Sequence, residues 1–189
     1  VLLMRSAHKP STVRDLGRVE IADLKQKVAA IDASVWETQN ASKPNKFGVF
    51  NKTEHIIFRF IDSFKDHRYF TDKALWADWH KVIEPIMTEA VKPYGYEKGA
   101  HPRIMLAKLP AHGEISKHID RAPAAQFPHK IHVPLFTNPQ CHFHVGGHSF
   151  HMETGKAYEV NNNDLHWVTN EGDTDRIHLI FEYFPLEQS

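Results

Sequence analysis

The sequence of 189 residues contains a single cysteine, Cys141, and its charges cancel, with 23 basic and 23 acidic residues. One cysteine excludes an internal disulfide and a cysteine-based zinc site. It is consistent with a reducing compartment, so we expect a cytoplasmic protein. Zero net charge argues against a nucleic-acid partner, because such proteins carry a basic surface. The chain also lacks an apolar run of about 18 residues, so we expect no membrane-spanning helix.

Hydrophobic residues and histidine are plentiful. Hydrophobic residues make up 41% of the chain and aromatic residues 11%, which is enough to build a core. The length is typical of a single domain, which we place over residues 1–189. Ten of the 15 histidines lie between His112 and His178. Histidine is the commonest metal ligand, but most histidines in such a stretch are ordinary strand residues. Spacing, rather than abundance, must therefore identify a metal site.

The first hundred residues show mainly helical spacing of apolar positions. Residues 21–31 and 75–91 carry apolar side chains at steps of three and four, the pattern of an amphipathic helix. Pro85 is expected to kink the second helix or to begin a new one. Residues 55–61 have the character of a strand. We therefore predict that residues 1–100 form a mostly helical flanking region.

From residue 101 onward, the pattern changes to short apolar segments separated by proline, glycine and asparagine. Gly146-Gly147 between two such segments predicts a two-residue hairpin. This spacing predicts a sandwich or a barrel, of which the jelly roll is one form, with helices packed on it. The predicted strands are 103–109, 115–118, 130–136, 140–145, 148–152, 156–160, 165–169 and 176–184.

One His-x-Asp motif, His118-Ile119-Asp120, occurs in the chain. In an extended segment the two side chains lie on one face, so both can reach one ion. His166 lies 48 residues later on a predicted strand and is the candidate third ligand. Two histidines and a carboxylate leave three coordination positions open, as in non-haem Fe(II) oxygenases. His112-Gly113-Glu114 has nearly the same form, so the motif alone is not decisive.

Arg176 lies ten residues after His166, at the start of a predicted strand. Its guanidinium offers a planar fork that matches a carboxylate. In the mouth of a barrel, it would anchor the distal carboxylate of a dicarboxylic oxoacid. The alternative is an ion pair with Asp173 or Asp175 at the edge of the strand.

Seven short motifs and Gly155 follow one another in a recognisable order and spacing. They are Arg103-Ile104-Met105-Leu106, Leu109-Pro110, His118-x-Asp120, Lys130-Ile131-His132-Val133-Pro134-Leu135, Cys141-x-Phe143-x-Val145-Gly146-Gly147, His166-x-Val168-x-Asn170 and Arg176-x-His178-Leu179. Together they resemble the aspartyl/asparaginyl β-hydroxylase family of 2-oxoglutarate- and Fe(II)-dependent oxygenases. The resemblance implies a mainly β fold with flanking helices, in which residues 101–186 form a double-stranded β-helix core (jelly roll, cupin-like).

The resemblance also implies roles for individual residues. His118, Asp120 and His166 would ligate Fe(II), Arg176 would bind 2-oxoglutarate through its distal carboxylate, and His132 would contact this cosubstrate. Lys130 matches a basic residue that faces the acidic substrate in aspartyl hydroxylases, where arginine is usual. Lysine keeps the charge but loses the bidentate fork. Asp120 occupies the position that a halide would need, which argues against a halogenase.

The expected function is therefore a non-haem Fe(II)- and 2-oxoglutarate-dependent dioxygenase. It would use O2 to hydroxylate a small carboxylate-bearing substrate, either an amino acid or an aspartyl or asparaginyl residue of a peptide. Arg121 and Lys108 are further candidate contacts for an anionic substrate group.

The alternative is a cupin-type metal-binding protein without oxygenase activity. His142-x-His144 resembles the start of a cupin metal motif, but no glutamate follows four or five residues later. Arg176 and His132 distinguish the two hypotheses, because only the oxygenase needs an anchor for a dicarboxylate.

Overall fold

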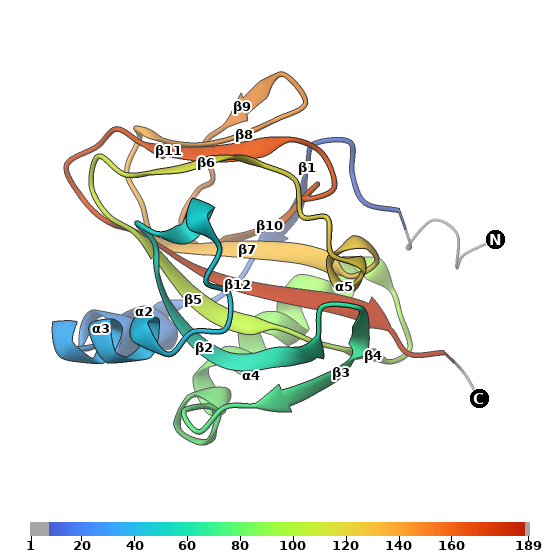
Figure 1. Ribbon diagram of the computed structural model, residues 1–189. Helices are drawn as coiled ribbons and strands as arrows, with labels where there is room; N and C mark the ends of the chain where they lie inside the picture. Colours follow the sequence, from blue (N-terminus) through green and yellow to red (C-terminus); the bar gives the residue numbers. More distant parts are fainter. Residues whose placement is uncertain (1–7, 188–189) are drawn as a thin grey trace.

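Two antiparallel sheets face each other in the computed structural model, which describes residues 8–187 (Figure 1). The larger sheet has the order β1-β10-β7-β12-β5-β2-β3, with β4 paired to β12, and the smaller sheet has the order β6-β11-β8-β9. The larger sheet contains β1 (Val13–Arg18), β2 (Glu54–Ser63), β3 (Asp66–Asp72), β4 (Gly99–Ala100), β5 (Ile104–Leu109), β7 (His129–Phe136), β10 (Lys156–Val160) and β12 (Arg176–Pro185). The smaller sheet contains β6 (Glu114–His118), β8 (Cys141–Val145), β9 (His148–Phe150) and β11 (His166–Asn170).

The predicted double-stranded β-helix is confirmed in this arrangement. Each of the eight strands predicted after residue 101 corresponds to a strand of the structure. Gly146 and Gly147 connect β8 to β9 with φ angles of 58° and 76°, a left-handed backbone that favours glycine. The predicted hairpin is therefore present.

The prediction of a mostly helical first hundred residues was wrong in part. Helices α2 (Ala22–Ala29), α3 (Ala33–Ala41) and α4 (Trp76–Val91) are present, and α4 continues through Pro85. However, β1 pairs with β10 and β2 with β5, so this region also supplies strands to the larger sheet. Only the strand at 55–61 was predicted. The strands β1 and β3 lie at the two edges of the sheet and are largely exposed, so their sequences carry little alternation of apolar and polar residues.

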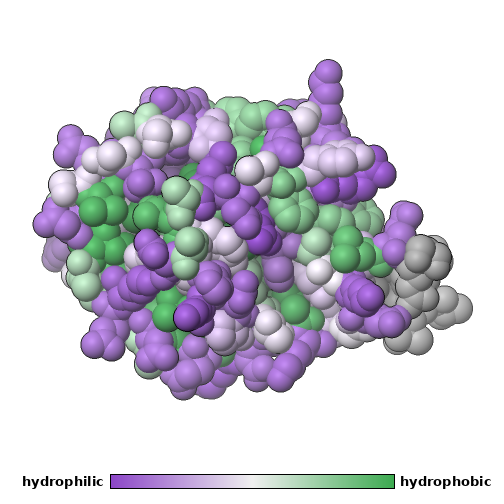
Figure 2. Space-filling model, turned by 90° about the horizontal axis from the view of Figure 1, so that it is seen from below, coloured by the Kyte–Doolittle hydropathy of each residue, from purple (hydrophilic) through white to green (hydrophobic). Residues whose placement is uncertain are grey.

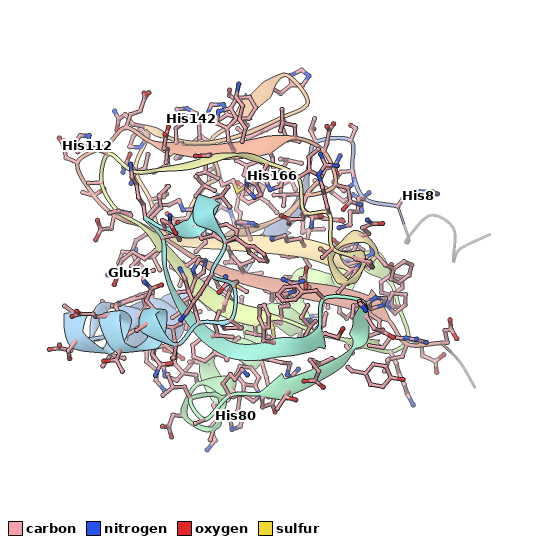
Figure 3. All side chains as sticks on the ribbon, viewed as in Figure 1. His8, Glu54, His80, His112, His142 and His166 are labelled. Carbon is pink, nitrogen blue, oxygen red and sulfur yellow. The ribbon has the colours of Figure 1, made fainter. Side chains whose placement is uncertain are left out.

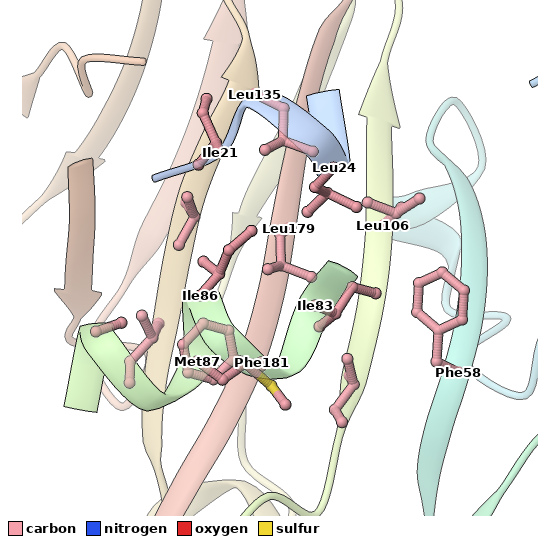
Figure 4. Close-up of a cluster of buried hydrophobic side chains, with 14 of the residues drawn as sticks. Ile21, Leu24, Phe58, Ile83, Ile86, Met87, Leu106, Leu135, Leu179 and Phe181 are labelled. Carbon is pink, nitrogen blue, oxygen red and sulfur yellow. The ribbon is translucent and has the colours of Figure 1, made fainter. Parts of the chain in front are cut away.

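The helices α2 and α4 cover the outer face of the larger sheet and form the main hydrophobic core with it. Ile83, Ile86 and Met87 of α4 pack against Leu179 and Phe181 of β12 (Figure 4). The face seen from below carries mainly hydrophilic side chains, with hydrophobic residues in separate small patches (Figure 2). Within residues 8–187, no helix has the length and apolarity to cross a membrane. Three short helices complete this part of the chain: η1 (Gly48–Phe50), η2 (Lys92–Tyr94) and α5 (Pro123–Gln126).

This core leads to a stability prediction. Leu179 is fully buried at the centre of the main core. Leu179→Ala should lower the free energy of unfolding by about 2–5 kcal/mol, because it removes buried methyl groups and leaves a cavity. Val35→Ala, at a position that is 40% exposed on α3, should change it by less than about 0.5 kcal/mol. Urea denaturation followed by circular dichroism measures both variants, and equal effects would contradict this description of the core.

Candidate active site

A cavity of about 400 Å³ lies between the two sheets. Its walls come from both sheets and from the segment that contains η1. The size is within the range of small-molecule sites in proteins. Seven of the eight predicted site residues line it: His118, Asp120, Arg121, Lys130, His132, His166 and Arg176. Only Lys108 of the predicted set lies elsewhere.

The three candidate metal ligands lie at one wall of this cavity. His118 ends β6 and His166 begins β11, and the two are cross-strand partners in the smaller sheet. Asp120 follows β6 directly. One potential ligand atom from each of the three side chains lies within 4.8 Å of the others. Figure 3 labels His166 between the two sheets. This donor set, two imidazole nitrogens and one carboxylate oxygen, suits a non-haem Fe(II) ion.

Backbone carbonyl groups fix the orientation of both histidine rings. Nδ1 of His118 lies 2.7 Å from the carbonyl oxygen of Ser116, and Nδ1 of His166 lies 2.8 Å from that of Asp164. A carbonyl only accepts, so each Nδ1 carries the proton and donates. Nε2 of both rings is then left with its lone pair, the form that binds a metal. Burial lowers the pKa of His166 to about 4, which keeps this ring neutral at physiological pH.

The Asp120 carboxylate is held from one side. Its Oδ2 accepts hydrogen bonds from Nδ2 of Asn162 at 2.9 Å and from Nζ of Lys130 at 3.1 Å. Its Oδ1 lies 3.5 Å from Nε2 of His118 and so is directed toward the other candidate ligands. Burial raises the pKa of Asp120, but the Lys130 charge, the nearby His166 and these hydrogen bonds lower it more. The net pKa is well below its ordinary value, so the carboxylate stays ionised.

Arg176 lies in the same cavity and is only 2% exposed. Its Nε forms no hydrogen bond with any residue that the structure describes. The alternative, an ion pair of Arg176 with Asp173 or Asp175, is not found among residues 8–187. Asp173 pairs instead with His112, and Asp175 accepts a hydrogen bond from the backbone of Ala111. Burial lowers the pKa of Arg176 to about 10, so the group remains charged at neutral pH. Because this buried cation has no acidic partner among residues 8–187, it is suited to bind the carboxylate group of a ligand.

His132 lies close to Arg176 on the neighbouring strand and is paired with His178. The two Nδ1 atoms are 3.0 Å apart, so one ring donates to the other. Burial, followed by the charge of Arg176, lowers the pKa of both rings well below the ordinary value. The pair is therefore neutral. It offers ring atoms as hydrogen-bonding groups near the arginine without adding a second positive charge.

Lys130 and Arg121 lie at the cavity as expected, but Lys108 does not. Lys130 is half-buried and Arg121 is exposed. Lys108 forms an ion pair of 3.1 Å with Glu54 and packs over the ring of Trp36. Met105 and Ala107 of β5 face the cavity, so alternation along the strand turns Lys108 to the helix side. Lys108 therefore does not line the cavity, contrary to its expected place beside the substrate.

The other histidines of interest lie apart from the three candidate ligands. His112 lies before β6 and is paired with Asp173, at the other end of the strand from His118. His142 and His144 of β8 flank Phe143, which lines the cavity, so they lie on the opposite face of the smaller sheet, where His144 stacks on Trp167. Among residues 8–187, the group of side chains that could hold a metal ion consists of His118, Asp120 and His166 and includes none of these other histidines.

Several residues in or beside the cavity were not predicted from the sequence. Asn162 does not line the cavity, but its side chain donates to Asp120 and orients it. Arg103, just before β5, and Glu182 of β12 line the cavity. Both could have been found by alternation, since Arg103 is two residues before Met105 and Glu182 is six residues after Arg176.

Comparison with known proteins gives one family and a common fold. Residues 80–185, more than half of the chain, match the family model described as aspartyl/asparaginyl beta-hydroxylase. No curated protein sequence matches the chain. Among solved structures, AviO1 from Streptomyces viridochromogenes Tue57 has a TM-score of 0.59 at 13% identity, with 100% of this chain and 96% of that chain covered.

Two further structures are similar. A 2OG-Fe(II) oxygenase family oxidoreductase from Burkholderia pseudomallei has a TM-score of 0.56 at 12% identity, covering 87% of this chain and 90% of that one. A prolyl-4-hydroxylase from Pseudomonas putida has a TM-score of 0.51 at 13% identity, covering 94% of each chain. At these identities, the similarity shows a shared fold.

Proposed function

The chain belongs to the aspartyl/asparaginyl β-hydroxylase family, and on that premise we propose how its site is used. His118, Asp120 and His166 hold Fe(II), and Arg176 binds the distal carboxylate of 2-oxoglutarate, with His132 beside it. The reaction is the hydroxylation of a small carboxylate-bearing substrate by O2. Lys130 and Arg121 contact this substrate.

The observation that carries this proposal is the position of Arg176. A buried guanidinium with an unpartnered Nε shares one cavity with two histidines and a carboxylate. Leaving a buried charge unpaired costs free energy, so the arrangement favours a ligand that brings a carboxylate. A cupin-type protein that only binds a metal has no need of this arginine, and that alternative is less supported.

The protein's own groups supply binding, orientation and exclusion of water. When bound, Fe(II) and 2-oxoglutarate supply the oxidising chemistry: O2 oxidises a substrate C–H bond to C–OH while the oxoacid becomes succinate and CO2. Asn162 and Lys130 hold Oδ2 of Asp120, which leaves Oδ1 for the metal. Arg176 fixes one end of the oxoacid by a charge-assisted pair. Apolar side chains such as Phe143 and Val168 line the cavity and limit access of water.

A succinate assay tests the proposed function. The protein is incubated with Fe(II), 2-oxoglutarate and O2, first alone and then with free amino acids and Asp-containing peptides. We expect succinate release that depends on all three components and increases with a true substrate, whose mass increases by one oxygen atom. A protein that binds metal but releases no succinate under any of these conditions would support the cupin alternative. A chlorinated product in the presence of chloride would contradict hydroxylation.

Lys130 provides a prediction about the substrate. Lys130→Met should raise the substrate KM about tenfold, the loss expected for one charge-assisted hydrogen bond, and should raise the 2-oxoglutarate KM less. Lys130 also donates a hydrogen bond to the candidate metal ligand Asp120, so the variant could bind Fe(II) more weakly. The assay therefore contains saturating Fe(II). Steady-state kinetics with each ligand varied in turn gives both constants. Equal shifts would assign Lys130 to the cosubstrate part of the cavity instead.

A further inference from the structure

Arg103 and Glu182 form a second charged group in the cavity, apart from the candidate ligands and from Arg176. Arg103 precedes β5 and Glu182 lies on β12, and both line the cavity. Nε of Arg103 lies 2.8 Å from Oε1 of Glu182, and the two side chains are 12% and 2% exposed. Backbone contacts hold the two segments together, because the amide of Glu182 donates to the carbonyl oxygen of Arg103 at 3.0 Å.

The pair keeps hydrogen-bonding capacity that no described residue uses. Nε and Nη2 of Arg103 and Oε1 of Glu182 are buried and make no hydrogen bond among residues 8–187. The contact of 2.8 Å is therefore a close charge pair without hydrogen-bond geometry. The guanidinium packs over the ring of Phe60 at 5.0 Å, which fixes its plane. Buried polar atoms without hydrogen bonds cost folding free energy unless a ligand forms hydrogen bonds with them.

The register of β12 separates this pair from Arg176. Arg176 and Glu182 are six residues apart on one strand, or roughly 20 Å along it. Glu182 is the cross-strand partner of Lys130, whose Nζ contacts Asp120. The candidate metal ligand Asp120 is thus linked to the Glu182 end of the cavity. A cosubstrate bound at Arg176 leaves this end for the molecule that is hydroxylated.

The charges of the pair define the group that it binds. A lone carboxylate at Arg103 would also meet Glu182, and a lone cation at Glu182 would also meet Arg103. A ligand that carries both signs on neighbouring atoms gives each side chain a group of opposite charge and adds no net charge to the cavity. Lys9 lies nearby, but its ammonium donates to the carbonyl oxygen of Ala125 and to the side chain of Asn162. Apolar Phe64, Met105 and Ile180 form the walls between these polar groups.

We propose that Arg103 and Glu182 form a subsite that binds the carboxylate and ammonium groups of a free α-amino acid, an inference that rests on the proposed function. Arg103 donates charge-assisted hydrogen bonds to the carboxylate, and Oε1 of Glu182 accepts one from the ammonium group. The amino acid side chain then extends toward His118, Asp120 and His166. Peptide-bound residues, whose nitrogen and carboxyl carbon are in amide bonds, lack both charges and bind poorly.

Binding to the full chain tests the subsite without turnover. The protein is saturated with Mn(II) and 2-oxoglutarate, and thermal melting is measured with each of the twenty free L-amino acids. We expect at least one to raise the melting temperature. The N-acetyl derivative and the α-carboxamide of that amino acid should each bind at least tenfold more weakly. The proposal is overturned if no amino acid stabilises the protein, or if either derivative binds within threefold of the free amino acid.

Variants then connect the effect to the two side chains. Glu182→Gln and Arg103→Gln should each weaken binding of the amino acid at least tenfold and change the Kd of 2-oxoglutarate less than twofold. Lys108→Gln, on β5 and outside the cavity, is the control and should change neither. If a single variant does not fold, the double variant R103Q/E182Q removes both charges together, and unchanged affinity in it overturns the proposal. Failure of the wild-type protein to bind 2-oxoglutarate would instead refute the proposed function.

Discussion

Alanine at His118, Asp120 or His166 is expected to abolish succinate release. Each side chain supplies one ligand atom of a group that lies within 4.8 Å, and an ion held by two ligands binds weakly and in a different geometry. Asn162→Ala removes only a hydrogen bond to Asp120 and should cost roughly 10–100-fold in metal affinity, as is typical for partners of metal ligands. Metal titration and the succinate assay measure these effects.

Two histidines outside this group are the controls. His112→Ala and His144→Ala remove a surface ion pair and an outer-face stacking contact, and both should leave turnover nearly unchanged. A His118→Ala protein that releases succinate at the normal rate would show that the metal is held elsewhere.

Arg176→Ala should raise the KM for 2-oxoglutarate by about 10- to 100-fold. A charge-assisted hydrogen bond to a charged group contributes roughly 1.5–3 kcal/mol, and each 1.4 kcal/mol corresponds to about a tenfold change in affinity. The guanidinium is buried, so water does not replace it. The binding of Mn(II) in the absence of 2-oxoglutarate should be nearly unchanged, because Arg176 is not a candidate ligand.

The comparison of Arg176→Lys with Arg176→Ala makes the test specific. Lysine keeps the charge but offers no planar fork, so the KM should lie between those of the wild-type and alanine proteins. If both variants keep the wild-type KM, the carboxylate of 2-oxoglutarate is bound by another group.

The sequence was most informative where a residue's neighbours along the strand decide its position. Alternation predicts that His118 and Asp120 share one face of an extended segment. Both side chains line the cavity, as does Arg176 at the start of its predicted strand. The same alternation explains why Lys108 does not line the cavity, because it is one residue out of phase with Met105 and Ala107. Applying alternation to β5 as strictly as to the motif would have excluded Lys108 and selected Arg103.

Other features depend on contacts between distant segments and were out of reach. Asn162 orients Asp120 across 42 residues of chain, and its sequence, a run of asparagines, is that of an ordinary turn. The edge strands β1 and β3 are formed by pairing with β10 and β2, while their own residues are mostly exposed. No local pattern reports such a pairing.

The two faces of the strands in the larger sheet have a consequence for engineering this protein. Along β5 and β12, residues such as Met105, Ala107 and Ile180 face the cavity, and their immediate neighbours Leu106 and Leu179 face the helices. Because successive side chains point to opposite sides, the two sets can be varied independently. A library restricted to the cavity-facing positions would search for new substrates while leaving the helix-packed layer intact. A one-residue insertion in either strand would exchange the two sets and lose both properties at once.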